Sequence, residues 1–382
     1  MRYKLKDIFD LQMGKTPSRN NSEYWNTEDY KWISIADLGK TGKYISETKE
    51  YLSESAVTES GIKIIPANTV VMSFKLSIGK TAITAEDMYS NEAIMAFHDR
   101  HVIDILPEYI YYMFKYKNWD EGSNKAVMGK TLNKATLSEV EIDICSMEEQ
   151  REIVNVLDKM MAVLEGRETE LALLDNLIKA RFVEMFGNPR INPNKYPTKL
   201  IKDTCIVITG NTPSRKVHEY YGDAIEWIKT DNIVSSLLYP TVASESLSDS
   251  GKAVGRAVDA GAILMACIAG SVASIGRVCI TDREVAFNQQ INAIVPKEYD
   301  VRFLHALLQI SKDYLVEDIN MSLKGIISKS KLEEKEFIVP SMEEQVGFAD
   351  FVKQIDKSKV AIQAALDKTQ LLFDSLMQKY FG

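Results

Sequence analysis

The pentapeptide Ser-Met-Glu-Glu-Gln occupies residues 146–150 and returns unchanged at residues 341–345. In each copy the serine stands three positions before the second glutamate, which is the spacing of a capping box that begins a helix. The stretches that follow contain no proline, and apolar side chains recur in them every seven residues. A heptad repeat sustained over such a length predicts two long helices of the coiled-coil type.

The heptad repeat also predicts which side chains pack between the two helices. The positions assigned to this helix seam are Leu157, Leu164, Leu171, Ile178, Ile355, Ile362, Leu366 and Phe373. A helix that packs only on its own domain is the alternative, but the apolar stripes are too long for one small domain to cover. When Asp175 and Asp374 are taken as equivalent positions, the two helices are expected to differ in length.

Four further motifs recur in the same order, at offsets of 195 to 197 residues. The first is Gly-x-Thr-Pro-Ser-Arg, the second begins with a tryptophan, the third is Ser-Ile-Gly followed by Lys or Arg, and the fourth is a single asparagine. The repeated pairs are 14–19 with 210–215, 32–38 with 227–233, 77–80 with 274–277, and Asn91 with Asn288. Ordered repetition at nearly one offset indicates that the chain is two copies of one unit.

Each copy is predicted to be a mixed α/β domain followed by a long helix. Short apolar runs at 70–74 and 263–268 are bounded by turn residues and indicate buried strands. Short helices are predicted at 107–117 and 301–311, so that the fold class is α+β. The predicted segments are a domain at 1–145, a helix at 146–187, a linker at 188–198, a domain at 199–340 and a helix at 341–382.

The composition is that of a folded protein in a reducing compartment. The chain has 382 residues, of which 45% are hydrophobic and 26% are charged, with a formal net charge of −8. None of its four cysteines forms a C-x-x-C pair, the N-terminus has no signal-peptide core, and no apolar run reaches the ~18 residues that cross a bilayer. We therefore expect a soluble, cytoplasmic protein, in which any contact with nucleic acid comes from local basic patches or from partners.

The sequence lacks the motifs of known catalysts. Gly-Lys-Thr at 14–16 and at 79–81 resembles the end of a phosphate loop, but the positions where that loop needs an earlier glycine hold Phe9 and Phe74. A histidine pair at 98 and 101 is spaced as one side of a metal site, yet no cysteine pair completes it. The sequence thus predicts a non-catalytic protein with no metal or cofactor of its own.

The repeated motifs are instead rich in residues that contact nucleic acids. Hydroxyls, backbone N–H groups and basic side chains bind phosphates, whereas Arg, Lys, Asn and Gln read base edges, and a glutamate such as Glu92 can accept from cytosine. The candidate DNA-binding residues of the first copy are Thr16, Ser18, Arg19, Lys75, Ser77, Lys80, Asn91, Lys130, Thr131 and Lys134. Those of the second copy are Thr212, Ser214, Arg215, Lys229, Ser274, Arg277, Asn288, Gln289, Gln290, Lys324 and Ser328.

Several of these motifs also have a purely structural interpretation. Thr-Pro-Ser-Arg is common in turns that bind nothing. Trp32 and Trp227 are better explained as core residues than as stacking platforms. Asn91 and Asn288 can cap the end of a strand instead of reading a base. The duplication of these motifs favours a role in DNA binding for the motifs as a set. Two similar modules in one chain are suited to reading two halves of a DNA target.

In these motifs and their order, the chain resembles the DNA-specificity subunit of a type I restriction–modification system. The resemblance covers essentially the whole chain and rests on the duplicated order, since no single motif is decisive. It implies two target-recognition domains related by a pseudo-twofold axis and separated by two antiparallel helices. Each domain would read one half of a bipartite, asymmetric DNA target, and the helices would act as the spacer between the halves.

The resemblance also implies partners. Two modification subunits that carry S-adenosylmethionine would bind the helical region on double-stranded DNA, and restriction subunits would add ATP-driven translocation and cleavage. No membrane takes part. Two other classes remain open from the residues alone: a structural adaptor without nucleic acid, and a scaffold that binds DNA without sequence preference. A single-chain nuclease or methyltransferase is disfavoured by the missing catalytic motifs.

Overall fold

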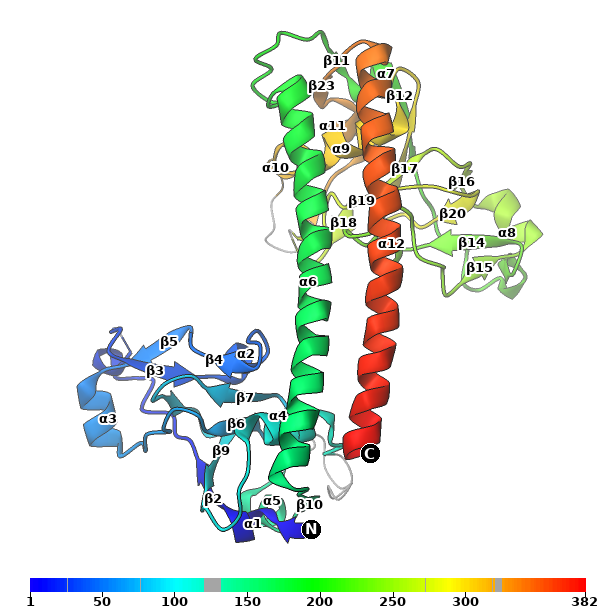
Figure 1. Cartoon of the computed structure of the whole chain (residues 1–382). Coiled ribbons are helices and arrows are strands. Elements are labelled where there is room, and N and C mark those ends of the chain that lie inside the picture. Colours follow the sequence, from blue (N-terminus) through cyan, green and yellow to red (C-terminus); the bar gives the residue numbers. More distant parts are fainter. Residues whose placement is uncertain (26, 76, 120–131, 272, 318, 320–324) are drawn as a thin grey trace. The chain divides into compact units, whose positions relative to one another are not determined.

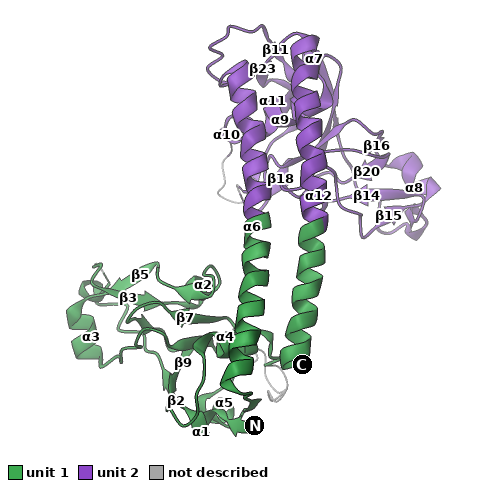
Figure 2. Ribbon diagram, in the orientation of Figure 1, with its two compact units in different colours: residues 1–167, 365–382 green, residues 168–364 purple. Residues whose placement is uncertain are grey.

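The chain divides into two compact units. The computed structural model describes residues 1–25, 27–75, 77–119, 132–271, 273–317, 319 and 325–382. Unit 1 consists of residues 1–167 and 365–382, and unit 2 of residues 168–364 (Figure 2). Both units combine helices with mixed sheets, so the predicted α+β class is confirmed. Among the described residues, no helix is both long and apolar enough to cross a membrane.

The repeated pentapeptides begin two helices of 40 residues each, α6 (Met147–Phe186) and α12 (Met342–Phe381; Figure 1). Both helices start with the expected capping box. The Ser146 N–H donates to the Glu149 carboxylate at 2.9 Å, and the matching contact of the second helix is 3.0 Å long. Each serine hydroxyl in turn accepts from the backbone of its glutamate.

The expectation that the two helices differ in length is wrong. Both contain 40 residues, and the offset of 195 residues between the pentapeptides persists along the helices. Asp374 therefore corresponds to Lys179, and the expected match to Asp175 came from residue identity instead of from the offset. After α6 the chain leaves the helix at Gly187, whose φ of 74° is the left-handed conformation that ends many helices.

Unit 1 is built on a five-stranded sheet that packs against α4 (Pro107–Tyr116). In spatial order its strands are β2 (Phe9–Met13), β9 (Ile94–Asp99), β6 (Val70–Ser73), β7 (Thr81–Thr84) and β4 (Tyr44–Ile45). A second sheet contains β5 (Glu50–Leu52), β3 (Tyr30–Ile33) and β8 (Tyr89–Ser90). The other elements are β1 (Arg2–Lys4), paired with β10 (Glu141–Asp143), α1 (Leu5–Ile8), η1 (Ser22–Tyr24), α2 (Ile35–Leu38), α3 (Glu54–Ser60) and α5 (Lys134–Ser138).

Unit 2 repeats this plan, with α9 (Val301–Ile310) packed on its central sheet. That sheet contains β12 (Cys205–Thr209), β21 (Ile291–Pro296), β17 (Ile263–Ala266) and β19 (Val278–Ile280). The second sheet contains β13 (Tyr221–Gly222), β15 (Ser246–Leu247), β14 (Ile225–Ile228), β20 (Val285–Phe287) and β16 (Ala257–Val258). The other elements are β11 (Thr198–Leu200) with β23 (Glu336–Ile338), β18 (Ile268–Ala269) with β22 (Gly325–Ile326), α7 (Ile201–Thr204), η2 (His218–Tyr220), η3 (Thr230–Asn232), α8 (Asp249–Val254), α10 (Lys312–Val316) and α11 (Lys329–Glu333).

A buried glutamine fixes the first turn of each long helix to its own unit. The Gln150 side chain is fully buried, and its carbonyl oxygen accepts from the Leu106 N–H at 2.9 Å. Its amide donates to the carbonyl oxygens of Asp104 and Cys145, both at 3.1 Å. Gln345 makes the same three contacts in unit 2, to the residues that precede α9 and α12. The glutamine therefore joins the start of a long helix to the start of the helix that packs on the central sheet.

In each unit the helix seam combines apolar side chains with polar contacts. In unit 1, Leu157, Leu164 and Phe373 are buried in the core, and Leu366 packs against them. The other seam positions are half-buried: Leu171, Ile178, Ile355 and Ile362. Within unit 2 an ion pair joins Lys359 to Asp175 at 2.6 Å, and within unit 1 the Arg167 guanidinium donates to α12.

The glutamine contacts predict a large effect from one substitution. Gln150→Met keeps the volume but leaves one N–H and two carbonyl groups unpaired in the core, so we expect the free energy of unfolding to fall by about 2–4 kcal/mol. Gln354→Met, on the exposed face of α12, is the matched control and is expected to change little. Chemical denaturation measures both. Equal stabilities for the two variants would mean that the buried contacts contribute nothing.

The seam gives a second stability prediction. Leu164→Ala removes a side chain that is 5% exposed in the core of unit 1, which should cost about 2–5 kcal/mol. Leu173→Ala removes the same atoms from a side chain on α6 that is 61% exposed, and it should cost far less. If thermal unfolding of the Leu164 variant matched that of the wild-type chain, this position would not belong to the seam.

Candidate functional site

The predicted loops of unit 1 meet at one end of its central sheet. In the antiparallel register Met13 of β2 and Met72 of β6 both lie opposite Met95 of β9. The loops that follow β2 and β6 and the turn that precedes β9 therefore leave the sheet at the same end. These are residues 14–19, the described part of 74–80, and 91–93, which we call the loop end of unit 1.

Unit 2 has a loop end of the same construction. Thr209 of β12 and Met265 of β17 both lie opposite Asn292 of β21. The loop end of unit 2 therefore consists of residues 210–215, the described part of 267–277, and 288–290. The Ile327 N–H donates to the carbonyl oxygen of Cys267 at 2.8 Å, which brings the predicted residue Ser328 to the same end.

The first loop of each unit, residues 14–19 or 210–215, begins with a glycine. This glycine allows the loop to lie directly against the turn that precedes β9 or β21. A Cβ atom at Gly14 would lie 2.3 Å from the carbonyl oxygens of Ser90 and Asn91, and one at Gly210 would lie 2.1 Å from the carbonyl oxygen of Asn288. Real Cβ contacts are not this short, so the repeated motif needs glycine here. Just after it, the Lys15 N–H donates to Ser90 at 2.8 Å.

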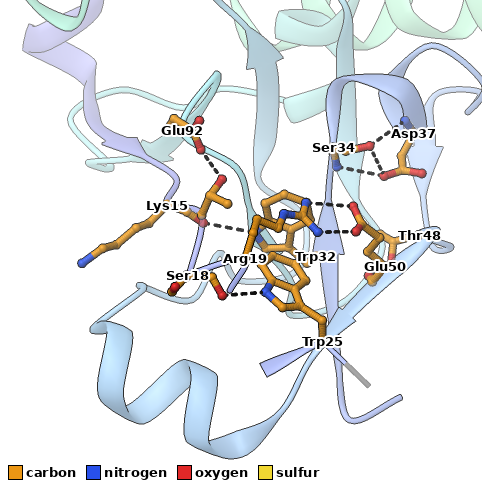
Figure 3. A network of polar contacts seen from close by, with 11 residues as sticks. Lys15, Ser18, Arg19, Trp25, Trp32, Ser34, Asp37, Thr48, Glu50 and Glu92 are labelled. Carbon is orange, nitrogen blue, oxygen red and sulfur yellow. Dashed lines mark hydrogen bonds and ion pairs between the residues drawn. The ribbon is translucent and has the colours of Figure 1, made fainter. Parts of the chain in front are cut away.

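The arginine that ends this motif is held between an aromatic residue and a carboxylate. In unit 1 the Arg19 guanidinium lies 3.7 Å from the centre of the Trp25 ring and 4.9 Å from that of Trp32 (Figure 3). It also donates to both carboxylate oxygens of Glu50. Trp32 is 2% exposed, as expected for a core residue, and its indole N–H donates to Lys15 at 3.1 Å. These contacts give Arg19 a structural role in the described chain.

Unit 2 makes the same arrangement with a different aromatic partner. The Arg215 guanidinium lies 4.5 Å from the Tyr221 ring centre and 5.1 Å from that of Trp227, which is buried like Trp32. Glu245 pairs with Arg215 at 2.6 Å and also accepts from Lys229. The hydrogen bond from Lys229 is the main reason that the pKa of Glu245 lies below its usual value.

The turn before β9 or β21 carries an asparagine that shapes the backbone. The Asn91 side chain accepts from the Ala93 N–H at 3.0 Å, and Asn288 accepts from the Gln290 N–H at 3.0 Å. The Asn288 amide also donates to the Gln290 side chain at 3.2 Å. Both asparagines therefore cap their turns, which is the structural alternative that the sequence left open.

A threonine from the first loop reaches across to the residue after each asparagine. In unit 1 the Thr16 hydroxyl donates to the Glu92 carboxylate, and this hydrogen bond is the main cause of a lowered pKa for Glu92. In unit 2 the Thr212 hydroxyl donates to the Gln289 side-chain oxygen. Glu92 and Gln289 are both exposed, so the same contact presents a different side chain in each unit.

Cations in the loops that follow β6 and β17 have fewer strong partners than Arg19 and Arg215. The Lys75 ammonium lies 5.2 Å from the Phe74 ring centre. The Arg277 guanidinium donates to the carbonyl oxygens of Ser274 and Thr230, at 3.2 and 3.0 Å. In the part of the chain that the structure describes, Lys75, Lys80 and Arg277 form no ion pair with a carboxylate.

A cleft beside Arg277 contains two cations that the sequence did not single out. It encloses about 260 Å³ in unit 2 and is lined by Lys179 of α6 and Lys312 of α10 as well as Arg277. Burial, followed by the charge of Arg277, lowers the pKa of Lys312. Asp175, the acidic residue of the cleft, is already paired with Lys359. The three cations lack a carboxylate partner among the described residues, so the cleft favours a bound anion.

The remaining candidates lie in three settings. Ser18, Ser77, Lys134, Ser214 and Ser328 are exposed, and the hydroxyl of Ser328 caps α11. Ser274 and Gln290 are half-buried. Lys130, Thr131 and Lys324 lie outside the described residues. No group of three or more His, Cys, Asp or Glu side chains that could hold a metal occurs in the described ranges.

The sequence analysis missed the carboxylates that hold the arginines. Glu50 and Glu245 are separated by 195 residues, the offset of the other motifs, so the repeat contained the signal. Lys179 and Lys312 had no such signal, because neither belongs to a repeated motif. Their position became evident only from the packing of α6 and α10 around the cleft.

Comparison with known proteins identifies relatives of both copies. A sequence model of the family described as "Type I restriction modification DNA specificity domain" matches residues 1–173 and 193–370. The chain is 30% identical over 258 residues to the type I restriction enzyme MjaIX specificity subunit of Methanocaldococcus jannaschii, covering 61% of this chain and 58% of that protein. It is 29% identical over 170 residues to the EcoR124I/EcoR124II specificity subunit of Escherichia coli, covering 42% and 41%. The matches thus span about half the length of these curated relatives.

Solved structures share the fold over the whole chain. The S subunit of a type I restriction–modification system from M. genitalium superposes with a TM-score of 0.56 at 13% identity, covering 100% of this chain and 96% of that one. A structure described as the basis of complex assembly and conformational transition of the type I R-M system gives a TM-score of 0.59 at 16% identity, covering 100% and 97%. At these identities the likeness is one of fold.

The close approach at the first loop predicts the effect of adding one methyl group. Gly14→Ala forces the Cβ against two carbonyl oxygens, which should lower the free energy of unfolding by about 1–3 kcal/mol and move the first loop of unit 1. Gly42→Ala is the matched control, because nothing lies within 4 Å of its Cβ. Denaturation curves for both variants test this expectation, and equal curves would contradict it.

Proposed function

Because the chain belongs to the family of type I restriction–modification DNA specificity proteins, we propose that it selects the DNA target of a methyltransferase and restriction complex. Each unit reads one half of a bipartite, asymmetric sequence through its loop end. The observation that carries this proposal is the pair of loop ends built on one plan, with the same glycine, arginine and asparagine contacts, that present Glu92 in one unit and Gln289 in the other.

The charge distribution agrees with this assignment. A net charge of −8 disfavours unspecific binding of the whole surface to DNA. Local cations that have no carboxylate partner among the described residues are nevertheless present at both loop ends, including Lys75, Lys80 and Arg277. Lys179 and Lys312 extend the cationic surface of unit 2 to the adjoining cleft. These residues are placed to neutralise backbone phosphates, which supply affinity but no sequence information.

In this proposal, methyl transfer and DNA cleavage are carried out by partner subunits. We propose that two modification subunits dock on the helical region, bind S-adenosylmethionine and transfer its methyl group, and that restriction subunits supply ATP-driven translocation and cleavage. The helices offer apolar side chains for such docking, since Leu173 of unit 2 is 61% exposed and Leu371 of unit 1 is 70% exposed. This chain is non-catalytic in the proposal, and its helices act as the spacer between the half-sites.

One reconstitution separates the proposal from its alternatives. The chain is co-purified with its modification subunit and incubated with S-adenosylmethionine and a library of random duplexes, and the methylated products are sequenced. The proposal predicts methylation at a motif with two specified halves and an unspecified gap. Methylation without sequence preference would indicate a DNA scaffold, and a complex that retains no DNA would indicate a structural adaptor.

The cleft of unit 2 predicts a change in salt dependence. Lys312→Ala removes one cation that has no carboxylate partner among the described residues. The slope of the logarithm of the DNA association constant against log salt concentration should therefore become shallower by about 0.9, the contribution of one phosphate. Lys297→Ala is the control, because Lys297 follows β21 at the opposite end from the loops. Binding to the target duplex at several salt concentrations measures both slopes. An unchanged slope for Lys312→Ala would exclude the cleft from the interface.

A further inference from the structure

The same backbone position carries an acceptor in unit 1 and an amide in unit 2. Glu92 and Gln289 each follow the turn-capping asparagine, and each is held by the threonine of the first loop. The glycine contact that sets the distance between loop and turn is also shared. The two sites thus share these backbone and side-chain contacts, and they differ in the side chain that the threonine holds.

The threonine contact orients the outer atom of each side chain. In unit 1 the Thr16 hydroxyl binds Glu92 Oε2, and no other residue of the described chain donates to Oε1. In unit 2 the Thr212 hydroxyl donates to Gln289 Oε1, which places Nε2 on the side away from the threonine. Within the described chain Nε2 donates to no other group. Unit 1 therefore presents a fixed acceptor, and unit 2 presents a fixed donor.

Other polar side chains at the loop ends are less available. Asn91 and Asn288 use their side-chain oxygens to cap the turns. Arg19 and Arg215 are stacked on aromatic rings and paired with carboxylates. The Thr16 hydrogen bond and, to a smaller extent, the nearby charges of Lys75 and Arg19 also lower the pKa of Glu92. A side chain that is exposed, oriented and has a free atom is suited to base recognition.

We propose that Glu92 and Gln289 are base-reading residues at corresponding positions of the two half-sites. In the major groove only cytosine N4 and adenine N6 are donors, so Glu92 selects a base with an amino group and rejects guanine and thymine edges. Gln289 Nε2 selects an acceptor edge, such as N7 of a purine. This inference rests on the proposed function and adds to it the residues and the kind of base that each unit recognises.

The threonines act as positioning residues in this scheme. Each keeps one end of the reading side chain occupied and so reduces the freedom that binding a base would otherwise remove. Thr16→Val removes the hydroxyl but keeps the shape of the side chain. We expect this variant to weaken the preference at the Glu92 position without reversing it, because the carboxylate is still an acceptor.

Reciprocal exchange of the two side chains tests the inference. Glu92→Gln and Gln289→Glu are each assembled with the modification subunit, and methylated products from the random duplex library are sequenced. Glu92→Gln should shift the preference at one position of one half-site away from cytosine, whose major-groove edge offers no acceptor, by about tenfold in relative methylation. Gln289→Glu should shift the preference at one position of the other half-site away from guanine and thymine, whose major-groove edges offer no amino donor. Glu28→Gln, an exposed glutamate elsewhere in unit 1, should leave the motif unchanged.

The outcomes separate this inference from the proposed function. If the wild-type complex shows no sequence preference, the proposed function itself fails. If the wild-type complex is selective and both exchanges leave its motif unchanged, the proposed function stands and the base-reading assignment is wrong. Loss of methylation at all targets, with the same preference among the residual products, would also overturn the assignment, because it would indicate disturbed folding or docking.

Discussion

The helix seam is the constraint on which the rest of the structure depends. Neither long helix can remove its apolar stripe from water alone, so each unit combines a segment of α6 with a segment of α12. In unit 1 the final residues of the chain complete the core, where Phe373 and Met377 are buried with Leu157 and Leu164. A unit of this kind contains residues from both copies of the repeat.

The seam and the buried glutamines together explain why the pentapeptide is repeated. Its serine and second glutamate begin the helix, and its glutamine attaches that helix to the helix on the central sheet. The most recognisable sequence motif is therefore structural. The same is true of the first loop motif, whose glycine and arginine maintain the shape of the loop end. The exposed residues between these contacts differ between the units and are free to determine specificity.

Much of the fold could be predicted because its signals are local or periodic. The seven-residue spacing and the capping boxes predicted α6 and α12 to within one residue at each end. The unequal helix lengths were a wrong prediction, since two aspartates were matched by identity although the offset pointed to Lys179. The contact between Arg19 and Glu50, which are 31 residues apart, depends on tertiary packing, and its only signal in the sequence is the offset of 195 residues between Glu50 and Glu245. For the same reason the cleft formed by Lys179, Arg277 and Lys312 was found only in the structure.

At each loop end, the register of three strands of the central sheet brings together loops that are distant in sequence. Hydrogen exchange of the complex with its modification subunit, with and without target DNA, tests this account most directly. We predict protection by DNA at residues 12–19 and 74–93 of unit 1 and at residues 208–216 and 266–292 of unit 2. Protection confined to other surfaces, with these segments unchanged, would contradict the account.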